Sequence, residues 1–265
     1  MTRPTAFITG ASSGIGAAFA RRLARDGYDL VLHGRREHLL ASLCRDLTAS
    51  HGVRADYVLA ELSSPEGAGL LRQRLERVER LAMLINNAGS GSTKLFHEEE
   101  LAGQHGMVQT HVVTALHLCH AAIPLMKRNG GGAIINVSSI ASFTPGKRSA
   151  TYCAAKSFLT AFSEALHLEV CGDGIRVQAL CPGFTTTDFH SRLGLTIGPG
   201  LRRVFMTPEA VVEQSMRDLR RGKVISVPGW TYRAIRLAAR LIPRGLYYVV
   251  ARGVAGRAGK GGSVV

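Results

Sequence analysis

The sequence has no long apolar run, few cysteines and few aromatic residues. No stretch of ~18 or more uncharged apolar residues occurs, so the sequence predicts no membrane-spanning helix. The apolar run after Pro4 is short and ends at Gly10, so we expect no signal peptide. The five cysteines are an odd number, and none belongs to a CxxC pair. This pattern argues against a disulfide framework or a zinc site and favours a reducing, cytoplasmic compartment.

Acidic residues are scarce relative to basic ones, and the imbalance is uneven along the chain. The 33 Lys and Arg against 19 Asp and Glu give a net charge of +14. Residues 217–265 hold eleven of the bases and a single acid, whereas the first 216 residues carry only +4. A strongly basic protein suggests nucleic-acid binding. Because aromatic residues are only 6% and no nucleic-acid motif is present, we expect no nucleic-acid partner.

Short apolar strands alternate with helices along most of the chain, without an internal repeat or a linker. Strands that are continuously apolar and each followed by a helix are typical of a parallel sheet buried on both faces. We predict one α/β domain over 1–228: a Rossmann-like, doubly wound parallel sheet of about seven strands with helices on both faces. The aperiodic segment 184–206 is a predicted lid. The predicted strands are 5–9, 28–32, 53–59, 82–86, 133–137, 175–180 and 223–227, and the predicted helices are 14–26, 36–50, 65–80, 100–128, 149–170 and 208–221.

A glycine-rich turn follows the first predicted strand. Its sequence, TGASSGIG from Thr9 to Gly16, places three glycines between a strand and a helix. Backbone of this kind can approach a pyrophosphate, whose charge meets the positive end of the helix dipole. The GxxxGxG spacing differs from the general GxGxxG fingerprint, and an ordinary glycine-rich turn is the alternative. The predicted cofactor contacts here are Gly10, Ser12, Ser13, Gly14, Ile15 and Gly16.

The second predicted strand leads into two arginines, Arg35 and Arg36, and the next acid is Glu37. At this place in a dinucleotide fold an acid binds a free ribose 2′-hydroxyl, whereas an arginine suits a 2′-phosphate. We therefore expect NADP(H) rather than NAD(H), with both arginines as contacts. The alternative is that they are solvated residues at the start of a helix.

Several motifs, in a fixed order over about residues 5–190, make the chain resemble the classical short-chain dehydrogenase/reductase family. Besides the glycine turn, they are Asn86-Asn87-Ala88-Gly89, Ser139, Tyr152-Cys153-Ala154-Ala155-Lys156 and Pro182-Gly183. The resemblance implies oxidoreductase activity and a homodimer or homotetramer assembled through helices 100–128 and 149–170. The further cofactor contacts that it implies are Glu61, Leu62, Asn87, Ala88, Gly89, Tyr152, Lys156, Pro182, Gly183, Thr185 and Thr187.

Three residues form the predicted catalytic group. Tyr152 and Lys156 are four apart on one helix and share a face, and Ser139 ends the fifth strand at the sheet edge where such folds bind ligands. A free phenol has a pKa near ~10, and a nearby ammonium lowers it by stabilising the phenolate. The Ser139 hydroxyl can hold a substrate oxygen on which charge develops. By resemblance, Tyr152 is the acid in reduction and the base in oxidation, and Lys156 also holds the nicotinamide ribose.

His111 departs from the family pattern, which has an asparagine in a water-mediated proton path to the lysine. A histidine could form similar hydrogen bonds or titrate near neutral pH, which makes it a candidate catalytic residue. A hydrogen-bonded core histidine is the alternative. His117 and His120 lie three apart on the same helix, but without further ligands we expect no metal site.

Residues 229–265 are predicted to be a basic, amphipathic extension rather than a second domain, with a disordered glycine-rich end at 255–265. Residues 231–250 could lie on an anionic membrane surface. Alternatively, their apolar face packs on the body or on a second subunit. At helical spacing, the basic face holds Arg233, Arg236, Arg240 and Arg244, and the residues largely opposite are Tyr232, Ile235, Ala238, Leu241 and Ile242.

Together these features predict an NADP(H)-dependent oxidoreductase that transfers hydride between nicotinamide and a carbonyl or secondary alcohol. We expect a lipophilic small-molecule substrate and carbonyl reduction as the direction. The alternative is a nucleotide-binding regulatory or scaffold protein of the same fold with little turnover. The expected location is the cytoplasm, peripheral to a membrane if 231–250 bind one.

Overall fold

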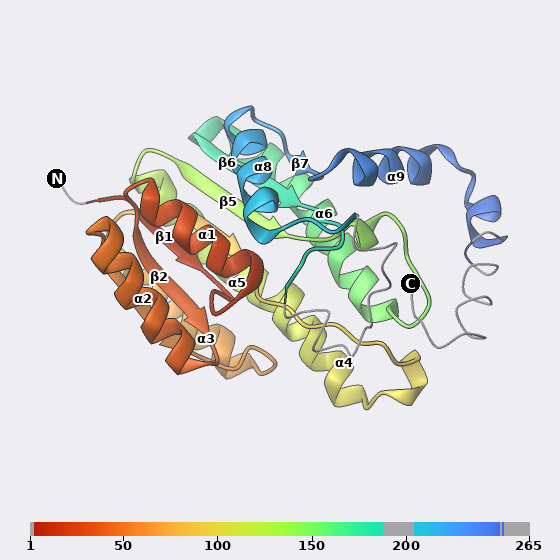
Figure 1. Cartoon of the computed structure of the whole chain (residues 1–265), viewed down its shortest axis with the longest axis horizontal. Helices are drawn as coiled ribbons and strands as arrows, with labels where there is room; N and C mark the ends of the chain where they lie inside the picture. The colour runs from red at the N-terminus through yellow and green to blue at the C-terminus, as the bar shows by residue number, and fades with distance from the viewer. Residues whose placement is uncertain (1–2, 188–203, 250, 252–265) are drawn as a thin grey trace.

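The computed structural model describes residues 3–187, 204–249 and 251 (Figure 1). Its strands form one parallel sheet in the order β3-β2-β1-β4-β5-β6-β7, which confirms the predicted doubly wound sheet. Most of the predicted lid at 184–206 lies outside the described residues. The whole of the glycine-rich end at 255–265 also lies outside them. The strands are β1 (Thr5–Ile8), β2 (Asp29–Gly34), β3 (Ala55–Leu59), β4 (Leu81–Asn86), β5 (Gly132–Val137), β6 (Ile175–Leu180) and β7 (Ile225–Ser226).

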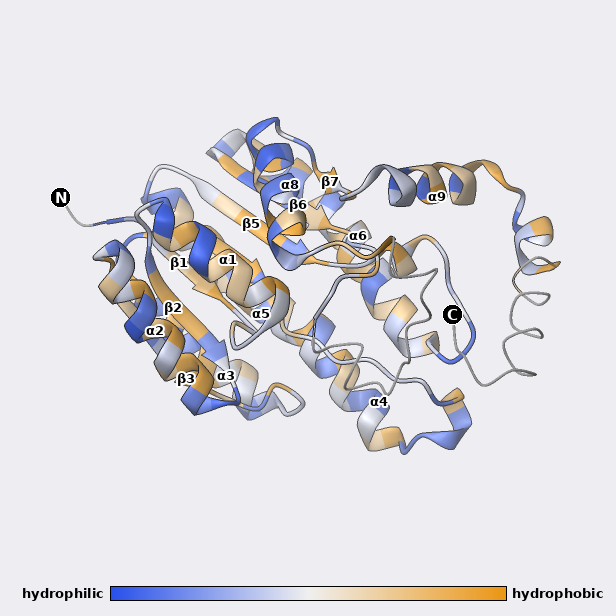
Figure 2. Ribbon diagram, viewed as in Figure 1, coloured by the Kyte–Doolittle hydropathy of each residue, from blue (hydrophilic) through white to orange (hydrophobic). Residues whose placement is uncertain are grey.

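Helices cover both faces of the sheet, and their apolar sides point toward it (Figure 2). One face packs against α1 (Gly14–Arg25), α2 (Glu37–His51) and α8 (Pro208–Arg220). The other packs against α3 (Pro65–Glu76), α5 (Thr114–Arg128) and α6 (Ala150–Val170). Because strand side chains alternate between the faces, Ile8 joins the first core and its neighbour Phe7 joins the second.

The helix predicted over 100–128 is continuous from Leu101 to Arg128, but it is not regular. It is divided into α4 (Leu101–Val108), a π-helical turn at Gln109–Val113 and α5. The Thr114 hydroxyl donates to the Gln109 carbonyl at 2.9 Å, so a side chain satisfies a carbonyl in the widened turn. A π turn adds a residue to a helical turn and is frequent at functional sites. Here it contains the buried His111.

The strand order reverses beside β1, which lies between β2 and β4. Crossovers leave such a point in opposite directions and open a crevice above the carboxyl ends of the strands. Buried amides fix this edge: Asn86 donates to the Asn136 side chain at 2.8 Å, and Asn136 donates to the Ser163 hydroxyl at 2.9 Å. These bonds tie β4 and β5 to α6. Leaving one such buried group without a partner costs about 1–3 kcal/mol.

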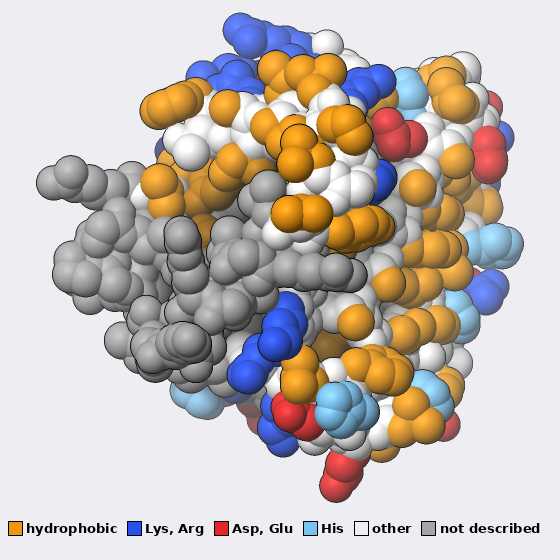
Figure 3. Space-filling model, turned by 90° about the vertical axis from the view of Figure 1, so that its right-hand side faces the viewer, with side chains coloured by type: hydrophobic (Ala, Val, Ile, Leu, Met, Phe, Trp, Pro, Cys, Tyr) orange, Lys and Arg blue, Asp and Glu red, His pale blue; other side chains and the backbone are white. Residues whose placement is uncertain are grey.

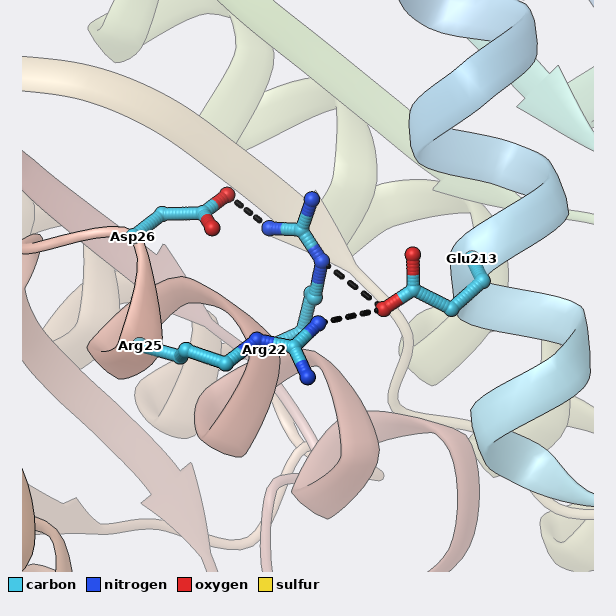
Figure 4. A network of polar contacts seen from close by, with 4 residues as sticks. All are labelled: Arg22, Arg25, Asp26 and Glu213. Carbon is cyan, nitrogen blue, oxygen red and sulfur yellow. Dashed lines mark hydrogen bonds and ion pairs between the residues drawn. The ribbon is translucent and has the colours of Figure 1, made fainter.

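A small ion-pair network joins α1 to α8 (Figure 4). Glu213 accepts from Arg22 at 2.9 Å and from Arg25 at 2.6 Å, and Arg22 also pairs with Asp26. Because most of these groups are partly exposed, each pair contributes only about 0–1 kcal/mol. The network therefore sets the position of α8 more than it stabilises the fold.

Helix α9 (Trp230–Leu241) projects from the body beyond β7 (Figure 1). After a break at Ile242 and Pro243, residues 244–249 are again helical. None of the helices in the described part of the chain combines the length and apolarity needed to cross a membrane.

Candidate active site

A cavity of about 850 Å³ lies above the carboxyl ends of the strands. Of the predicted site residues, all but Gly16 and Arg36 line it. The glycine turn, the segment after β4, the end of β5, α6 and the segment after β6 thus meet at one place. The sequence motifs predict this convergence, because carboxyl ends of parallel strands share one edge of the sheet.

The glycine turn is shaped by contacts that exclude side chains. Gly10 has a φ of +67°, and a Cβ there would lie 2.9 Å from the Ala88 Cα. Gly16 lies outside the cavity, because its Cα faces the Gly10 carbonyl and a Cβ would overlap that oxygen. The Asn87 amide donates to the carbonyls of Thr9 and Gly10 at 3.0 Å. The turn therefore brings backbone and the start of α1 to the cavity wall without intervening side chains.

The start of α1 can accept an anion. The Ser13 side chain precedes the helix without capping it, so the first backbone N–H groups have no side-chain partner from that residue. These groups and the helix dipole favour a phosphate at this end. The cavity reaches them through Ser12, Ser13 and Gly14.

Positive charge gathers beside the turn at the end of β2. Arg36 does not line the cavity but donates to the hydroxyls of Ser13 at 2.7 Å and Ser12 at 3.1 Å. Arg35 lines the cavity and pairs with the exposed Glu61 at 2.8 Å. An exposed pair of this kind contributes only about 0–1 kcal/mol, so a phosphate can compete for the guanidinium. The two arginines and two hydroxyls therefore fit a ribose 2′-phosphate.

His33 is a site residue that the sequence reasoning missed. Its Nδ1 accepts from the Gly10 backbone N–H at 3.3 Å, so its Nε2 donates to the Ala60 carbonyl at 3.1 Å. Burial lowers the pKa of His33, which keeps the ring neutral and this tautomer defined. The ring thereby holds the glycine turn against β3. No sequence signal identifies this role, since the sequence indicates only that His33 lies at the end of a buried strand.

The three residues predicted to be catalytic lie together, Ser139 just after β5 and the other two on α6. Lys156 is buried, its ammonium donates to the Val137 carbonyl at 2.7 Å, and it lies 5.7 Å from the centre of the Tyr152 ring. A hydrogen bond joins the Ser139 hydroxyl and Tyr152. Ser138, which the sequence left without a role, donates to the Lys156 carbonyl at 2.7 Å. It therefore ties α6 to the end of β5 behind the catalytic side chains.

Burial moves the pKa values of Tyr152 and Lys156 in opposite directions. It raises the pKa of Tyr152 to about 12, against the bond from Ser139, and lowers the pKa of Lys156 to about 7. The expected lowering of the phenol pKa is therefore not found in the protein by itself. The reason is that the dry site disfavours both charged forms. At neutral pH Tyr152 keeps its proton, which suits a proton donor.

His111 lies against Tyr152. Its ring is at 90° to the Tyr152 ring with 5.8 Å between centres. Its Nε2 is bound to the backbone of Ser90, 3.0 Å from the nitrogen and 2.8 Å from the oxygen. A Cβ on Gly89 would overlap the ring. Its Nδ1 is buried without a hydrogen-bond partner among the described residues.

The environment of His111 favours a neutral ring. Burial, and next the Lys156 charge, hold the pKa of His111 well below its usual 6.5, against the bond to Ser90. This favours the hydrogen-bonding interpretation of the residue over one in which it titrates near neutral pH. The sequence predicts His111 at the site, but not the π turn that contains it.

Helix α9 supplies part of the cavity wall, which the sequence analysis did not foresee. Tyr232 and Ile235 line the cavity. The Tyr232 hydroxyl accepts from the Phe184 N–H and donates to the Val204 carbonyl, both at 2.9 Å. Its ring packs where a Cβ on Gly183 would overlap. Tyr232 and Leu241, both predicted to lie largely opposite the arginines, have different surroundings, because the first is 3% exposed and the second 71%.

Comparison with known proteins gives one consistent result. A family model described as short chain dehydrogenase matches residues 4–197. Sulfoacetaldehyde reductase 2 of Chromohalobacter salexigens is 35% identical over 185 residues, covering 69% of this chain and 73% of that protein. A short-chain dehydrogenase from Sphingobium yanoikuyae, solved in complex with NADPH, superposes with a TM-score of 0.81 at 32% identity, covering 89% and 94% of the two chains. The bulky-bulky ketone specific alcohol dehydrogenase from Comamonas testosteroni superposes with a TM-score of 0.78 at 28% identity, covering 91% of this chain and 93% of that chain.

Proposed function

The chain belongs to the short-chain dehydrogenase family, and on this premise we propose that it is an NADP(H)-dependent oxidoreductase acting on a carbonyl or secondary alcohol. The observation that carries the proposal is the meeting of Ser139, Tyr152 and Lys156 with the glycine turn in one cavity. The arginines at the end of β2 and the NADPH in the Sphingobium relative support the phosphorylated cofactor. Carbonyl reduction is the direction that a protonated Tyr152 favours.

Each catalytic residue has a role that its surroundings support. When bound, the reduced nicotinamide supplies the hydride. Tyr152 donates its phenolic proton to the carbonyl oxygen, and Ser139 holds that oxygen by a hydrogen bond as negative charge develops. Lys156, fixed by the Val137 carbonyl, provides the positive charge that stabilises a phenolate after the proton leaves.

The remaining wall residues are proposed to bind the cofactor and select the substrate. The segments after β4 and β6 and the Glu61-Leu62 pair would hold the nucleotide. A lipophilic ketone suits the end of the cavity where apolar side chains meet: Ile140, Phe184, Tyr232 and Ile235. The similarity to a dehydrogenase named for bulky ketones supports this substrate class.

A panel of carbonyl compounds tests the proposed function. Purified protein is mixed with NADPH and ketones that range from short polar to bulky apolar ones, and the loss of NADPH absorbance is followed. We expect turnover, with the highest kcat/KM for apolar ketones. NADPH binding without turnover of any compound in the panel would instead support the regulatory or scaffold alternative.

Replacing Arg36 with alanine should reduce the preference for NADPH. Hydrogen bonds to charged groups contribute about 1.5–3 kcal/mol, so kcat/KM with NADPH should fall roughly 10–150-fold, while kcat/KM with NADH stays nearly unchanged. Arg45→Ala on the exposed side of the same helix is the matched control. Equal losses with both cofactors would contradict a role in binding the 2′-phosphate.

Replacing His111 with asparagine should leave kcat/KM within about tenfold of wild type, because a neutral ring that only forms hydrogen bonds can be replaced by an amide. Initial rates with NADPH and a saturating ketone provide the measurement. His111→Leu, which cannot form a hydrogen bond to Ser90, should be impaired more. If the asparagine variant bound NADPH normally but had no turnover, His111 would be catalytic.

The long helices offer faces for the proposed homodimer or homotetramer. Exposed apolar residues on α5 and α6 include Leu116, Phe158 and Leu168. The Phe158 ring stacks on Phe162 at 5.7 Å, which makes a flat aromatic surface on α6. The cytoplasmic location stays a prediction from the cysteine pattern.

A further inference from the structure

Helix α9 has two apolar faces: one contacts the body and the other is exposed. Tyr232 lies inward, buried beneath Gly183. On another side, Trp230, Leu237 and Leu241 form what we call the apolar stripe. Their spacing of seven and four residues places them on one helix face, and they are 77%, 58% and 71% exposed. Large apolar side chains aligned in this way mark an interaction surface.

The apolar stripe continues past Pro243. Leu246, Tyr248 and Val249 are 55%, 53% and 66% exposed, whereas Tyr247 lies inward and donates its hydroxyl to the Pro145 carbonyl at 2.6 Å. Tyr232 and Tyr247 therefore fasten the segment to the body at two points. Figure 3 draws the side of the molecule from which α9 projects, and apolar side chains gather at its top with Lys and Arg side chains beside them.

The charge within the segment that carries the apolar stripe has one sign. Residues 230–249 contain four arginines and no acid. Arg236 lies over the Phe143 ring at 5.2 Å, which holds this charge against the body. Arg240 and Arg244 are exposed. A partner for this surface must therefore combine an apolar interior with negative charge at its boundary.

We propose that the apolar stripe and its continuation over 246–249 insert into the surface of an anionic lipid bilayer, with Arg240 and Arg244 at the lipid phosphates. Amphipathic helices of this kind bury their apolar side at the boundary between headgroups and acyl chains. Tryptophan and tyrosine favour the same depth, and each arginine near an anionic surface adds to the attraction.

Charge argues against the other occupants. In a two-fold contact between two copies, each copy would bring the same positively charged segment to the interface, and that segment contains no acid to pair with an arginine. Within the chain, residues 188–203 carry three bases and one acid, and residues 252–265 carry three bases and no acid. Neither segment supplies the negative charge that this surface would attract.

The proposed contact would also serve the reaction. Because α9 contributes Tyr232 and Ile235 to the cavity wall, a bilayer on its outer side would bring the cavity edge near dissolved lipophilic compounds. This consequence rests on the substrate class proposed above, whereas the membrane contact itself does not. The test therefore uses binding, which can fail or succeed independently of turnover.

Trp230 is the only tryptophan of the chain, so its fluorescence reports directly on the apolar stripe. Full-length protein is mixed with vesicles of phosphatidylcholine alone or of phosphatidylcholine with phosphatidylserine. We expect co-sedimentation, a blue shift and quenching by brominated lipid with the anionic vesicles, all reduced by salt. Failure to bind the anionic vesicles, or equal binding to both kinds, would overturn the proposal.

Two pairs of substitutions refine the test. Arg240→Gln with Arg244→Gln should weaken binding about tenfold or more, and Leu237→Ser with Leu241→Ser should abolish the quenching. NADPH-dependent activity without vesicles should stay unchanged in both. Leu70→Ser, an exposed position on α3, should bind like wild type. If the leucine substitutions instead lowered the molar mass measured by light scattering, a second copy would be the occupant and the proposal would be overturned.

Discussion

Replacing Tyr152 with phenylalanine is expected to lower kcat for carbonyl reduction by roughly 10²–10⁴-fold, the usual contribution of a positioned proton donor. The substitution removes one oxygen from a ring that stays packed against His111. NADPH affinity should change little, because the glycine turn and the arginines at the end of β2 are untouched. The free energy of unfolding should not fall either, since the variant no longer buries a hydroxyl.

The measurement is single-turnover reduction with saturating NADPH, beside a fluorescence titration of NADPH binding. Tyr57→Phe is the matched control, because its hydroxyl donates to the exposed Glu37 carboxylate at 3.0 Å and Tyr57 does not line the cavity. Ser139→Ala should lower kcat by a factor in the same range, since it removes the hydrogen bond to the developing oxyanion. Activity in the Tyr152 variant close to wild type would show that another group donates the proton.

Much of the fold follows from sequence because its elements obey local rules. The apolar strands have turns and helices on both sides, so each ends within a few residues of its predicted bounds. Gly10 and Gly16 identify the first turn because no other residue fits their contacts. Tyr152 and Lys156 face one cavity because a spacing of four aligns side chains on a helix.

The features that sequence could not give depend on contacts made by distant segments. The π turn that contains His111 differs from a regular helix by one residue per turn, which hydrophobic spacing does not reveal. The division of α9 into an inner and an outer apolar face depends on Gly183, nearly fifty residues earlier in the chain, into whose free space Tyr232 packs. His33 likewise acquires its role from the Gly10 N–H.

The kcat/KM for carbonyl reduction should fall as the pH rises through about 7, and Lys156 is the expected cause. Burial lowers the pKa of Lys156 to about 7, and kcat/KM reports groups of the free enzyme. The ammonium is the form that stabilises the phenolate. Activity is therefore fully present below that pKa and falls about tenfold per pH unit above it. Burial raises the pKa of Tyr152 to about 12, so its titration should cause no second change in kcat/KM near neutral pH.

The identity of the titrating group can be established by substitution. Lys156→Arg, whose guanidinium stays charged throughout, should be slower but should lose the decline at alkaline pH. His111→Asn should keep the decline, because the pKa of that histidine lies well below 6.5 and the ring is already neutral where the decline begins. A decline that survives in the arginine variant would assign the pKa to another group. Because the buried amine that would stabilise the phenolate has its pKa lowered to about 7, the rate of reduction should respond to small changes of pH around 7.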